Sequence, residues 1–264
     1  MAPLTEVRPP HRHRRGTRPH RPTGPARRAP AGRVAPAPAP TAPDRRAAAA
    51  VRRAADVILA AAGLVVLSPL LVAAAVAIVV TDGRPVLFRQ RRVGRHGKPF
   101  TMIKLRTMVV DAEQRRADLA PVNECDGPLF KVRCDPRVTP VGRALRDTSL
   151  DEVPQLWNVL VGHMSLVGPR PALPAEVAAF DDEHRRRHAV RPGITGAWQA
   201  FARTDRSFER YRQLDLWYLE HRSLRLDARI VGRTAGQTVH SLARAVRPAP
   251  APEPVGLAVE RTEP

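Results

Sequence analysis

The most strongly apolar part of the chain is residues 57–80, which read VILAAAGLVVLSPLLVAAAVAIVV and carry no charged side chain. As an α-helix this segment would be about 36 Å long, whereas the hydrocarbon core of a bilayer is about 30 Å thick. It is longer than the apolar core of a typical cleaved signal peptide, and it begins far from the N-terminus. The pattern therefore predicts a helix that enters a membrane.

Ser68 and Pro69 lie at the midpoint of this apolar segment. Proline lacks a backbone N–H and clashes with the preceding turn, so we expect the helix to break or kink there. Arg52 and Arg53 precede the segment and further arginines follow it, so the positive-inside rule favours neither orientation. Two alternatives stay open on these residues. One is a re-entrant helix-break-helix over 51–82 with both ends cytoplasmic, and the other is a kinked helix that spans the membrane.

The pattern over residues 83–247 predicts a small domain that follows the membrane segment. Residues 86–108 alternate apolar and other positions around a glycine-containing turn, which is typical of a β-hairpin. The basic residues of this hairpin form either a solvated surface or one side of a phosphate site; they include Arg89, Arg91 and Arg92. We expect helices over 109–120, 176–188, 207–221 and from 224 onward.

The last of these helices has its apolar residues on one face. Such a basic amphipathic helix can rest on a membrane surface or pack on the protein's own core, and the sequence leaves both open. The fold class is therefore α+β and mainly helical: a re-entrant membrane helix-break-helix followed by a small cytoplasmic domain with a short β-hairpin and amphipathic helices. The apolar positions of the last helix are Leu224, Ala228, Val231, Ala235, Val239, Leu242 and Val246.

The two ends of the chain have a different composition from its middle. Residues 1–50 are rich in Pro, Ala and Arg, and residues 248–264 are similar, so we expect both to be disordered tails. Much of the net charge of +19 falls in the first tail. That tail has no aromatic residues between its arginines, so we expect no nucleic-acid partner. Cys125 and Cys134 lack the spacing of a metal site and are expected to be reduced thiols.

The richest motif is residues 143–171, RALRDTSLDEVPQLWNVLVGHMSLVGPRP. Here the carboxylate pair Asp151-Glu152 lies between Arg146 and Arg170. Fixed cations beside acids suit a site that binds phosphate and attacks it. The alternative is structural, because Ser149 with Glu152 also matches a helix capping box. The residues themselves leave capping and catalysis both open.

Several long motifs together resemble the bacterial sugar transferase family, the monotopic polyprenyl-phosphate phosphoglycosyl transferases, in their short form. The resemblance extends from about Arg52 to Val239. It favours catalysis over capping for the carboxylate pair. The motifs are FRQRRVGRHGKPFTMIKLRTM, NECDGPLFKVRCDPRVTPVGRALRDTSLDEVPQLWNVLVGHMSLVGPRP, RPGITGAWQAFAR and LDLWYLEHRSLRLDARI.

The resemblance implies a re-entrant helix broken at Ser68-Pro69 and a catalytic dyad Asp151-Glu152. It implies transfer of a sugar-1-phosphate from a nucleoside diphosphate sugar, such as a UDP-sugar, to polyprenyl (undecaprenyl) phosphate through a covalent phosphosugar-Asp intermediate. The products are polyprenyl-diphosphate-sugar and UMP. Mg2+ assists, with Asp151 as a candidate metal ligand. The residues that the resemblance implies for phosphate or nucleotide contacts are Lys104, Arg146 and Arg170.

The family's place is the inner membrane, with the catalytic domain facing the cytoplasm, where it initiates exopolysaccharide or other glycoconjugate biosynthesis. Two residues depart from the family pattern: His163 stands where an acid is usual, and Ala202 where glycine is common. Neither belongs to the dyad, so neither changes the expected reaction. The alternative function is a membrane-tethered, non-catalytic scaffold or a basic binding protein.

Overall fold

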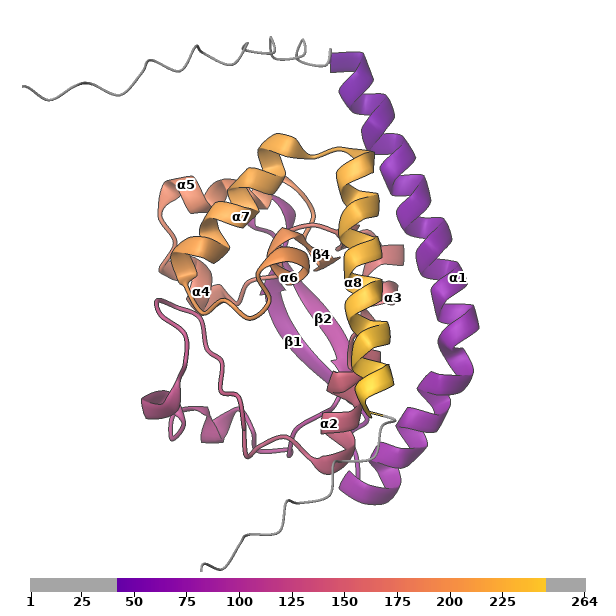
Figure 1. Ribbon diagram of the computed structural model, residues 1–264, viewed down its shortest axis with the longest axis vertical. Coiled ribbons are helices and arrows are strands. Elements are labelled where there is room, and N and C mark those ends of the chain that lie inside the picture. Colours follow the sequence, from indigo (N-terminus) through magenta and orange to yellow (C-terminus); the bar gives the residue numbers. More distant parts are fainter. Residues whose placement is uncertain (1–41, 246–264) are drawn as a thin grey trace, which may run out of the picture. The chain divides into compact units, whose positions relative to one another are not determined.

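The computed structural model describes residues 42–245, with side chains described for residues 46–241. The predicted tails lie outside this range, except that residues 42–50 are helical. The helices, drawn in Figure 1, are α1 (Ala42–Asp82), α2 (Pro140–Asp147), α3 (Gln155–Leu160), α4 (Pro174–Ala178), α5 (Asp182–Arg185), α6 (Ala197–Phe201), α7 (Phe208–His221) and α8 (Leu224–Ala245). The strands are β1 (Leu87–Val93), β2 (Pro99–Leu105), β3 (Ser165–Val167) and β4 (Gly193–Thr195).

Helix α1 runs without interruption through Pro69, and its axis bends (Figure 1). Pro69 removes the N–H that would bond the carbonyl of Val65 in a regular helix. The hydroxyl of Ser68 donates to that same carbonyl at 2.7 Å. A serine can thus satisfy the acceptor that a proline leaves free. Of the two outcomes expected at Ser68-Pro69, a break or a kink, the structure has a continuous helix whose axis bends.

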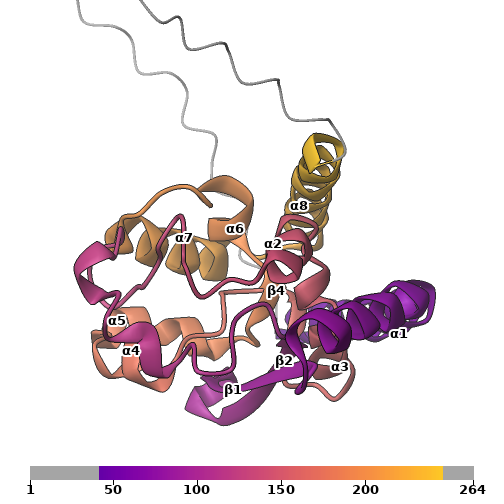
Figure 2. The same cartoon turned by 90° about the horizontal axis from the view of Figure 1, so that it is seen from below.

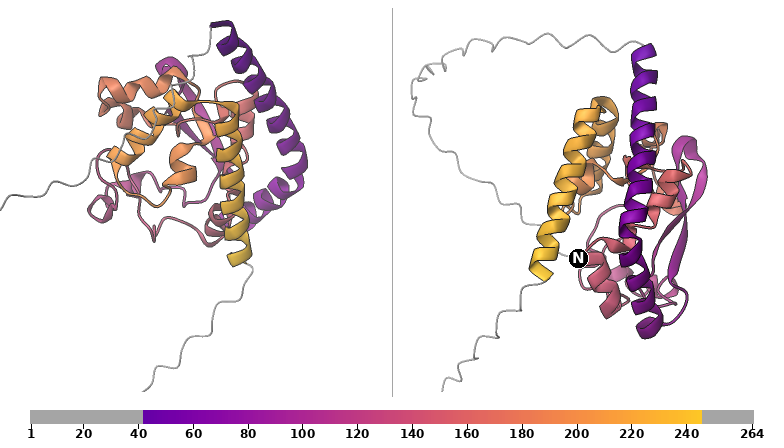
Figure 3. Two further views of the ribbon diagram at one scale, coloured as in Figure 1. Left: turned by 45° about the horizontal axis from the view of Figure 1, so that its top comes forward. Right: turned by 90° about the vertical axis from the view of Figure 1, so that its right-hand side faces the viewer.

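One face of α1 packs on the rest of the described chain, and the other face is exposed. Ala60 and Ile78 are fully buried, whereas Val65 and Val80 are 73% and 77% exposed. Ala60 packs in a cluster with residues of β2 and α3, and Ile78 in a second cluster that includes Leu105. In Figure 3 α1 runs alongside α8 and the hairpin. By length and composition α1 could cross a membrane, and its apolar part is mostly unburied.

The N-terminal half of α1 is fixed to the domain by polar contacts. The carboxylate of Asp56 is buried and accepts from the Ser165 hydroxyl at 2.8 Å and from the Leu166 N–H at 2.9 Å. The guanidinium of Arg53 donates to the Val159 carbonyl at 2.6 Å. A buried carboxylate is stable only when such donors satisfy it. These contacts hold α1 against α3 and β3.

The C-terminal end of α1 is fixed in the same way. The carboxylate of Asp82 accepts from the Thr139 hydroxyl at 2.7 Å, and the carbonyl of Asp82 accepts from the buried Arg106 at 2.8 Å. Thr139 is also the N-cap residue of α2. The helix is therefore bonded to the same folded unit on both sides of its apolar segment, 57–80.

Two small sheets complete the architecture. β1 and β2 form the predicted antiparallel hairpin, with Leu87 opposite Leu105 and Val93 opposite Pro99. β3 and β4 form a parallel pair that the sequence pattern did not predict. Of these two strands, β4 is labelled in Figure 2. The parallel pair needs glycine, because a side chain on Gly193 would overlap the backbone at residues 167–168. This close approach brings together the segments that follow β3 and β4.

Two of the predicted helices differ from the structure: one does not form, and the other is divided. Residues 109–120 form turns and short 3₁₀ pieces instead of a helix; Ala112 is the one buried side chain among them. Without an apolar face to pack, helical propensity alone does not hold a short helix. Residues 176–188 are divided, because α4 ends at Ala178 with Ala179 as its C-cap, and Asp181 caps the next helix by accepting from the His184 N–H at 2.7 Å.

Helix α8 packs with a face other than the one its apolar residues indicate. Leu226 and Ile230 are buried, but Val231 and Val239 of the predicted stripe are 41% and 65% exposed. Asp227 is buried on the packed face, where it pairs with Arg52 at 2.5 Å. A long-range ion pair with α1 thus takes part in setting the rotation of α8.

Candidate active site

The chain between α2 and α3 carries the carboxylate pair. Ser149 adopts a left-handed conformation with φ of 58°, and the next residues form a 3₁₀ turn, Leu150–Glu152, that leads into α3. The Ser149 side chain makes no capping hydrogen bond among the described residues. The capping-box interpretation is therefore wrong. Asp151 and Glu152 lie on the turn that enters the helix.

A cavity of about 630 Å³ has all five predicted polar site residues in its lining. These come from β2, from α2, from the turn before α3 and from the loop after β3, so the fold brings together residues that are far apart in sequence. Ser68 and Pro69 are not among its lining residues and lie in the middle of α1. The five polar residues are Lys104, Arg146, Asp151, Glu152 and Arg170.

Asp151 has an unusual electrostatic environment. Its side chain is buried, with 6% of the residue exposed. Burial, and then the neighbouring charge of Glu152, raise the pKa of Asp151 to about 6, although Lys104 and Arg146 oppose this rise. None of the ion pairs within the described residues involves either acid. Both carboxylates are therefore available to a ligand.

Two cations flank the acids from separate elements. Lys104, on β2, has its pKa lowered by burial, while Glu152 and Asp151 act to raise it. Arg146 lies in the last turn of α2, and its Nε donates to the Thr107 hydroxyl at 2.9 Å. Burial likewise lowers the pKa of Arg146, and Asp151 is the strongest opposing charge. These mutual effects place both cations within electrostatic range of the dyad.

Arg170 belongs to the loop after β3, which is held from two sides. Arg187 donates to the Arg170 carbonyl at 2.7 Å, and buried Arg92 donates to the Pro171 carbonyl at 2.9 Å. Arg187 is in turn paired with buried Asp215 at 2.7 Å. The backbone around Arg170 is thus fixed by charge-assisted hydrogen bonds, which are stronger than neutral ones. The side chain of Arg170 is among the residues that line the cavity.

The residues present fit a magnesium ion only in part. In the described portion of the chain, no three His, Cys, Asp or Glu side chains come together as a metal site. Asp151 and Glu152 offer carboxylate oxygens, the ligand type that Mg2+ prefers, and Mg2+ commonly takes its other ligands from water and substrate phosphates. The pair fits an ion that arrives with a phosphorylated substrate.

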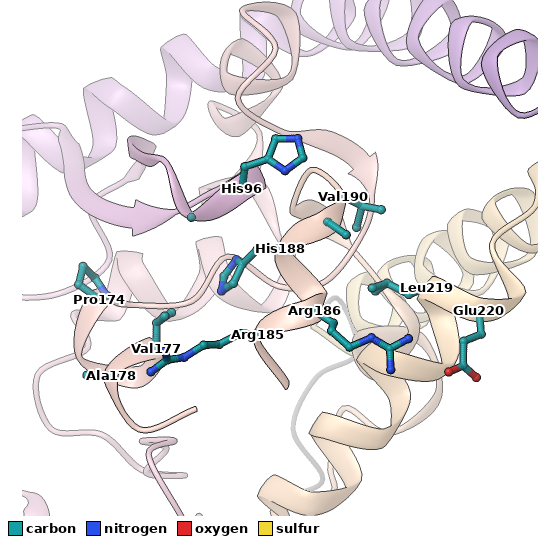
Figure 4. Close-up of a pocket in the computed structure, with 12 residues that line it drawn as sticks. His96, Pro174, Val177, Ala178, Arg185, Arg186, His188, Val190, Leu219 and Glu220 are labelled. Carbon is teal, nitrogen blue, oxygen red and sulfur yellow. The ribbon is translucent and has the colours of Figure 1, made fainter. Parts of the chain in front are cut away.

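A second hollow, of about 890 Å³, is drawn in Figure 4. Its described lining includes Arg185, Arg186 and His188, with Glu220 as the one acid. Burial lowers the pKa of His188 to about 4, so this imidazole is neutral at pH 7. This hollow contains no carboxylate pair. We therefore assign the chemistry to the cavity that contains Asp151.

Sequence reasoning missed several cations that line the same cavity. Of the hairpin arginines, Arg92 lines it, whereas Arg89 and Arg91 are exposed. The two-residue period of a strand puts Arg92 on the opposite face from Arg89 and Arg91, so the sequence itself separates Arg92 from the other two. The loop cations gave no such signal, because irregular segments have no period. They are Lys131, Arg133, Arg203 and Arg206.

Comparison with known proteins gives consistent relatives. Galactosyl transferase CpsE of Streptococcus agalactiae serotype III (strain NEM316) is 44% identical over 151 residues, which are 57% of this chain and 34% of that protein. Undecaprenyl-phosphate galactose phosphotransferase of Salmonella typhimurium (strain LT2) is 41% identical over 161 residues, 60% of this chain and 34% of that protein. Uncharacterized sugar transferase EpsL of Bacillus subtilis (strain 168) is 42% identical over 159 residues, 60% of this chain and 72% of that protein.

The chain thus spans about a third of the length of the first two relatives. The family model described as bacterial sugar transferase matches residues 47–241. That match contains α1 from residue 47 onward, the hairpin, the dyad and every cation among the described lining residues of the cavity. On this match, which covers more than half of its length, the chain belongs to the bacterial sugar transferase family.

Proposed function

We propose that this chain transfers a sugar-1-phosphate from a UDP-sugar to undecaprenyl phosphate, giving undecaprenyl-diphosphate-sugar and UMP. The observation that carries the proposal is the convergence of two acids and three cations on one cavity. The Salmonella relative is named for galactose phosphotransfer to undecaprenyl phosphate, and UDP-galactose is therefore the first donor to test. The reaction would initiate exopolysaccharide or other glycoconjugate biosynthesis.

In the first step a carboxylate oxygen of Asp151 attacks the β-phosphorus of the donor. An Asp151–phosphorus bond forms as the bond from that phosphorus to the bridging oxygen breaks, and the electron pair leaves with UMP. With a pKa of about 6, Asp151 is mostly ionised at neutral pH and more basic than an exposed aspartate. Lys104, Arg146 and Arg170 offset the negative charge of the phosphates.

In the second step an oxygen of the lipid phosphate attacks the same phosphorus. The new oxygen–phosphorus bond forms, the Asp151–phosphorus bond breaks, and the carboxylate is restored. Glu152 adjoins Asp151 and is placed to hold a proton or to orient the attacking phosphate. Bound Mg2+ would supply further screening of phosphate charge. The protein's own part is to hold the reacting groups in line.

We further propose that α1 enters and leaves the membrane on the cytoplasmic side. Its support is that α1 is bonded to the same folded unit on both sides of its apolar segment, through Asp56 before it and Asp82 after it. A helix with its ends on opposite sides of the bilayer would have to lose one set of these contacts. On this proposal the exposed apolar face of α1 meets lipid, and the membrane is the inner membrane.

Cysteine labelling tests this topology. In a cysteine-free background, Ala49→Cys and Arg89→Cys place thiols at exposed positions on the two sides of the apolar segment. Both should react with a membrane-impermeant maleimide only after the inner membrane of the cells is opened. Reaction of the residue-49 thiol in intact cells, with the residue-89 thiol protected, would exclude the proposed topology.

Detection of the covalent intermediate tests the chemistry. Purified protein in nanodiscs is incubated with Mg2+ and UDP-galactose or UDP-glucose, without lipid acceptor. UMP should be released in an amount no greater than the enzyme, and the peptide that contains Asp151 should gain the mass of one phosphosugar. A non-catalytic scaffold would release no UMP with any UDP-sugar. A mass gain on another residue would end the assignment of Asp151.

A further inference from the structure

The candidate cavity contains a second group of cations, distinct from those around the dyad. Lys131 comes from the segment between β2 and α2, and Arg203 and Arg206 come from the loop between α6 and α7. Their contacts join them to one another's loops and to Glu124, whereas the strongest charges that act on Asp151 and on Lys104 come from other residues. The cavity therefore has two cationic regions.

The second group is compact. The ammonium of Lys131 donates to the carbonyl of Arg203 at 3.1 Å. The pKa of Lys131 is lowered, first by burial and then by the positive charges of Arg206 and Arg203. Three cations thus lie within range of one another in a partly desolvated place. Such an arrangement is unfavourable unless an anion offsets it.

Among the described residues, Glu124 is the one acid that forms an ion pair with this group, and it pairs with Arg206 at 2.7 Å. Asp126 and Asp205 lie in the same loops, but none of the three acids is among the residues that line the cavity. No ion pair of the described residues involves Lys131 or Arg203. Because these three cations line the cavity and the three acids do not, the group leaves an excess of positive charge facing the cavity. Arginine and lysine together are the side chains that proteins use for phosphate.

The proposed chemistry requires a second phosphate position. In phosphoryl transfer the entering and leaving oxygens lie roughly in line across the phosphorus. UMP therefore departs from the face opposite Asp151. When Asp151 is itself expelled in the second step, the lipid phosphate must enter from that same opposite face. UMP and polyprenyl phosphate are both phosphate monoesters, so one set of cations can serve each in turn.

We propose that Lys131, Arg203 and Arg206 form an exchange subsite for phosphate monoesters, which holds the phosphate of departing UMP and then that of the entering lipid. The proposal rests on the proposed function for its two occupants. Removal of these three cations should slow both half-reactions, although Lys104, Arg146 and Arg170 remain in the cavity with the dyad. UMP and the lipid phosphate should also compete for the phosphosugar-enzyme.

The test uses the full-length protein in nanodiscs and the variants Lys131→Ala, Lys131→Gln and Arg203→Ala. Arg225→Ala, at an exposed position on α8, is the charge-matched control. UMP affinity of the resting enzyme is measured by calorimetry, with inorganic phosphate as a second probe. The phosphosugar-enzyme is then chased either with UMP or with undecaprenyl phosphate, and both rates are followed by quenched flow.

The cluster variants should weaken UMP binding at least tenfold and slow both chases, while Arg225→Ala stays within twofold of wild type. Loss in one chase with the other unchanged would overturn the shared subsite, as would UMP affinity within twofold of wild type. Wild-type enzyme that forms no adduct with any donor would instead refute the proposed function. The UMP and phosphate titrations would then still decide whether the cluster binds phosphate.

Discussion

Replacement of Asp151 by asparagine should make the protein more stable at neutral pH. The pKa of this buried carboxyl is about 6, against an ordinary value of 3.8, because burial and Glu152 disfavour its charge. Each tenfold difference in acid dissociation constant corresponds to 1.36 kcal/mol, so the charged form costs the folded state about 3 kcal/mol. Asparagine has the same shape without the charge, and Asp151→Asn removes that cost.

The dependence on pH follows from the direction of the pKa change. Between about pH 4 and pH 6 the folded state holds more protons at this site than the unfolded state, so wild-type stability falls as pH rises through that window. Above about pH 6 the full loss of stability is present, and below about pH 4 there is no loss of stability from this carboxyl. The variant lacks this contribution, so its advantage should appear above pH 6 and vanish below pH 4.

Asp135→Asn is the matched control, because Asp135 is equally buried but paired with Arg137 at 2.7 Å. A hydrogen bond from Arg137 is the main cause that lowers the pKa of Asp135, so its ionised form stabilises the fold above its unfolded pKa. Asp135→Asn should therefore destabilise the protein at pH 7. The two aspartates should give effects of opposite sign.

Thermal unfolding in one detergent, at pH 7.5 and at the lowest pH where the protein stays soluble, measures the effect. For a domain of this size about 3 kcal/mol corresponds to a rise of roughly 6 °C or more in Tm. UMP release, assayed in parallel, should be abolished in Asp151→Asn. A capping role would give a small loss of stability, about 0.3–1 kcal/mol, with turnover retained. An unchanged or lower Tm at pH 7.5 would refute the desolvation argument.

Three further outcomes are expected. The rate of UMP release at limiting donor should fall as pH drops below about 6, because Asp151 must be ionised; a rate independent of pH between 5 and 8 would contradict this. Arg187→Lys keeps a charge beside Asp215 but loses the fork that also bonds the Arg170 carbonyl, so the KM for the donor should rise severalfold, with adduct formation retained. Deletion of residues 1–40 should leave turnover in nanodiscs within tenfold of the full-length value.

Local patterns predicted those elements whose stability is decided locally. The hairpin follows from alternation around a glycine turn, and the structure confirms an antiparallel pair there. Helix α7 begins where Ser207 can cap it, and that side chain accepts from the Arg210 N–H at 3.2 Å. Helix α8 was predicted in extent but not in orientation. Its burial depends on Asp227 meeting Arg52, a contact that no helical period contains.

The residues of the site likewise fall into a group that the sequence predicted and a group that it did not. Asp151, Glu152, Arg146 and Arg170 lie within one continuous motif, and they could be named because that motif resembles a family. The second cationic group was not predicted, because Lys131 and its neighbours come from segments far apart in the chain that meet only through loop contacts. Irregular loops give no periodic signal, so tertiary structure was needed to find them.

Helix α1 is packed against the short helix α3, which follows the turn that carries Asp151. Gly63 on α1 lies so close to α3 that a side chain there would meet Leu156 at 3.0 Å, and Leu156 is four residues beyond the dyad. Arg53 bonds the last turn of the same short helix. Any shift of α1 along its axis would therefore move α3, and the turn that carries Asp151 would move with it. On the proposed placement, the depth of α1 in the bilayer sets the height of the nucleophile relative to the lipid phosphates. On that placement, the hydrogen bonds on the two sides of the apolar segment hold α1 in one position relative to Asp151.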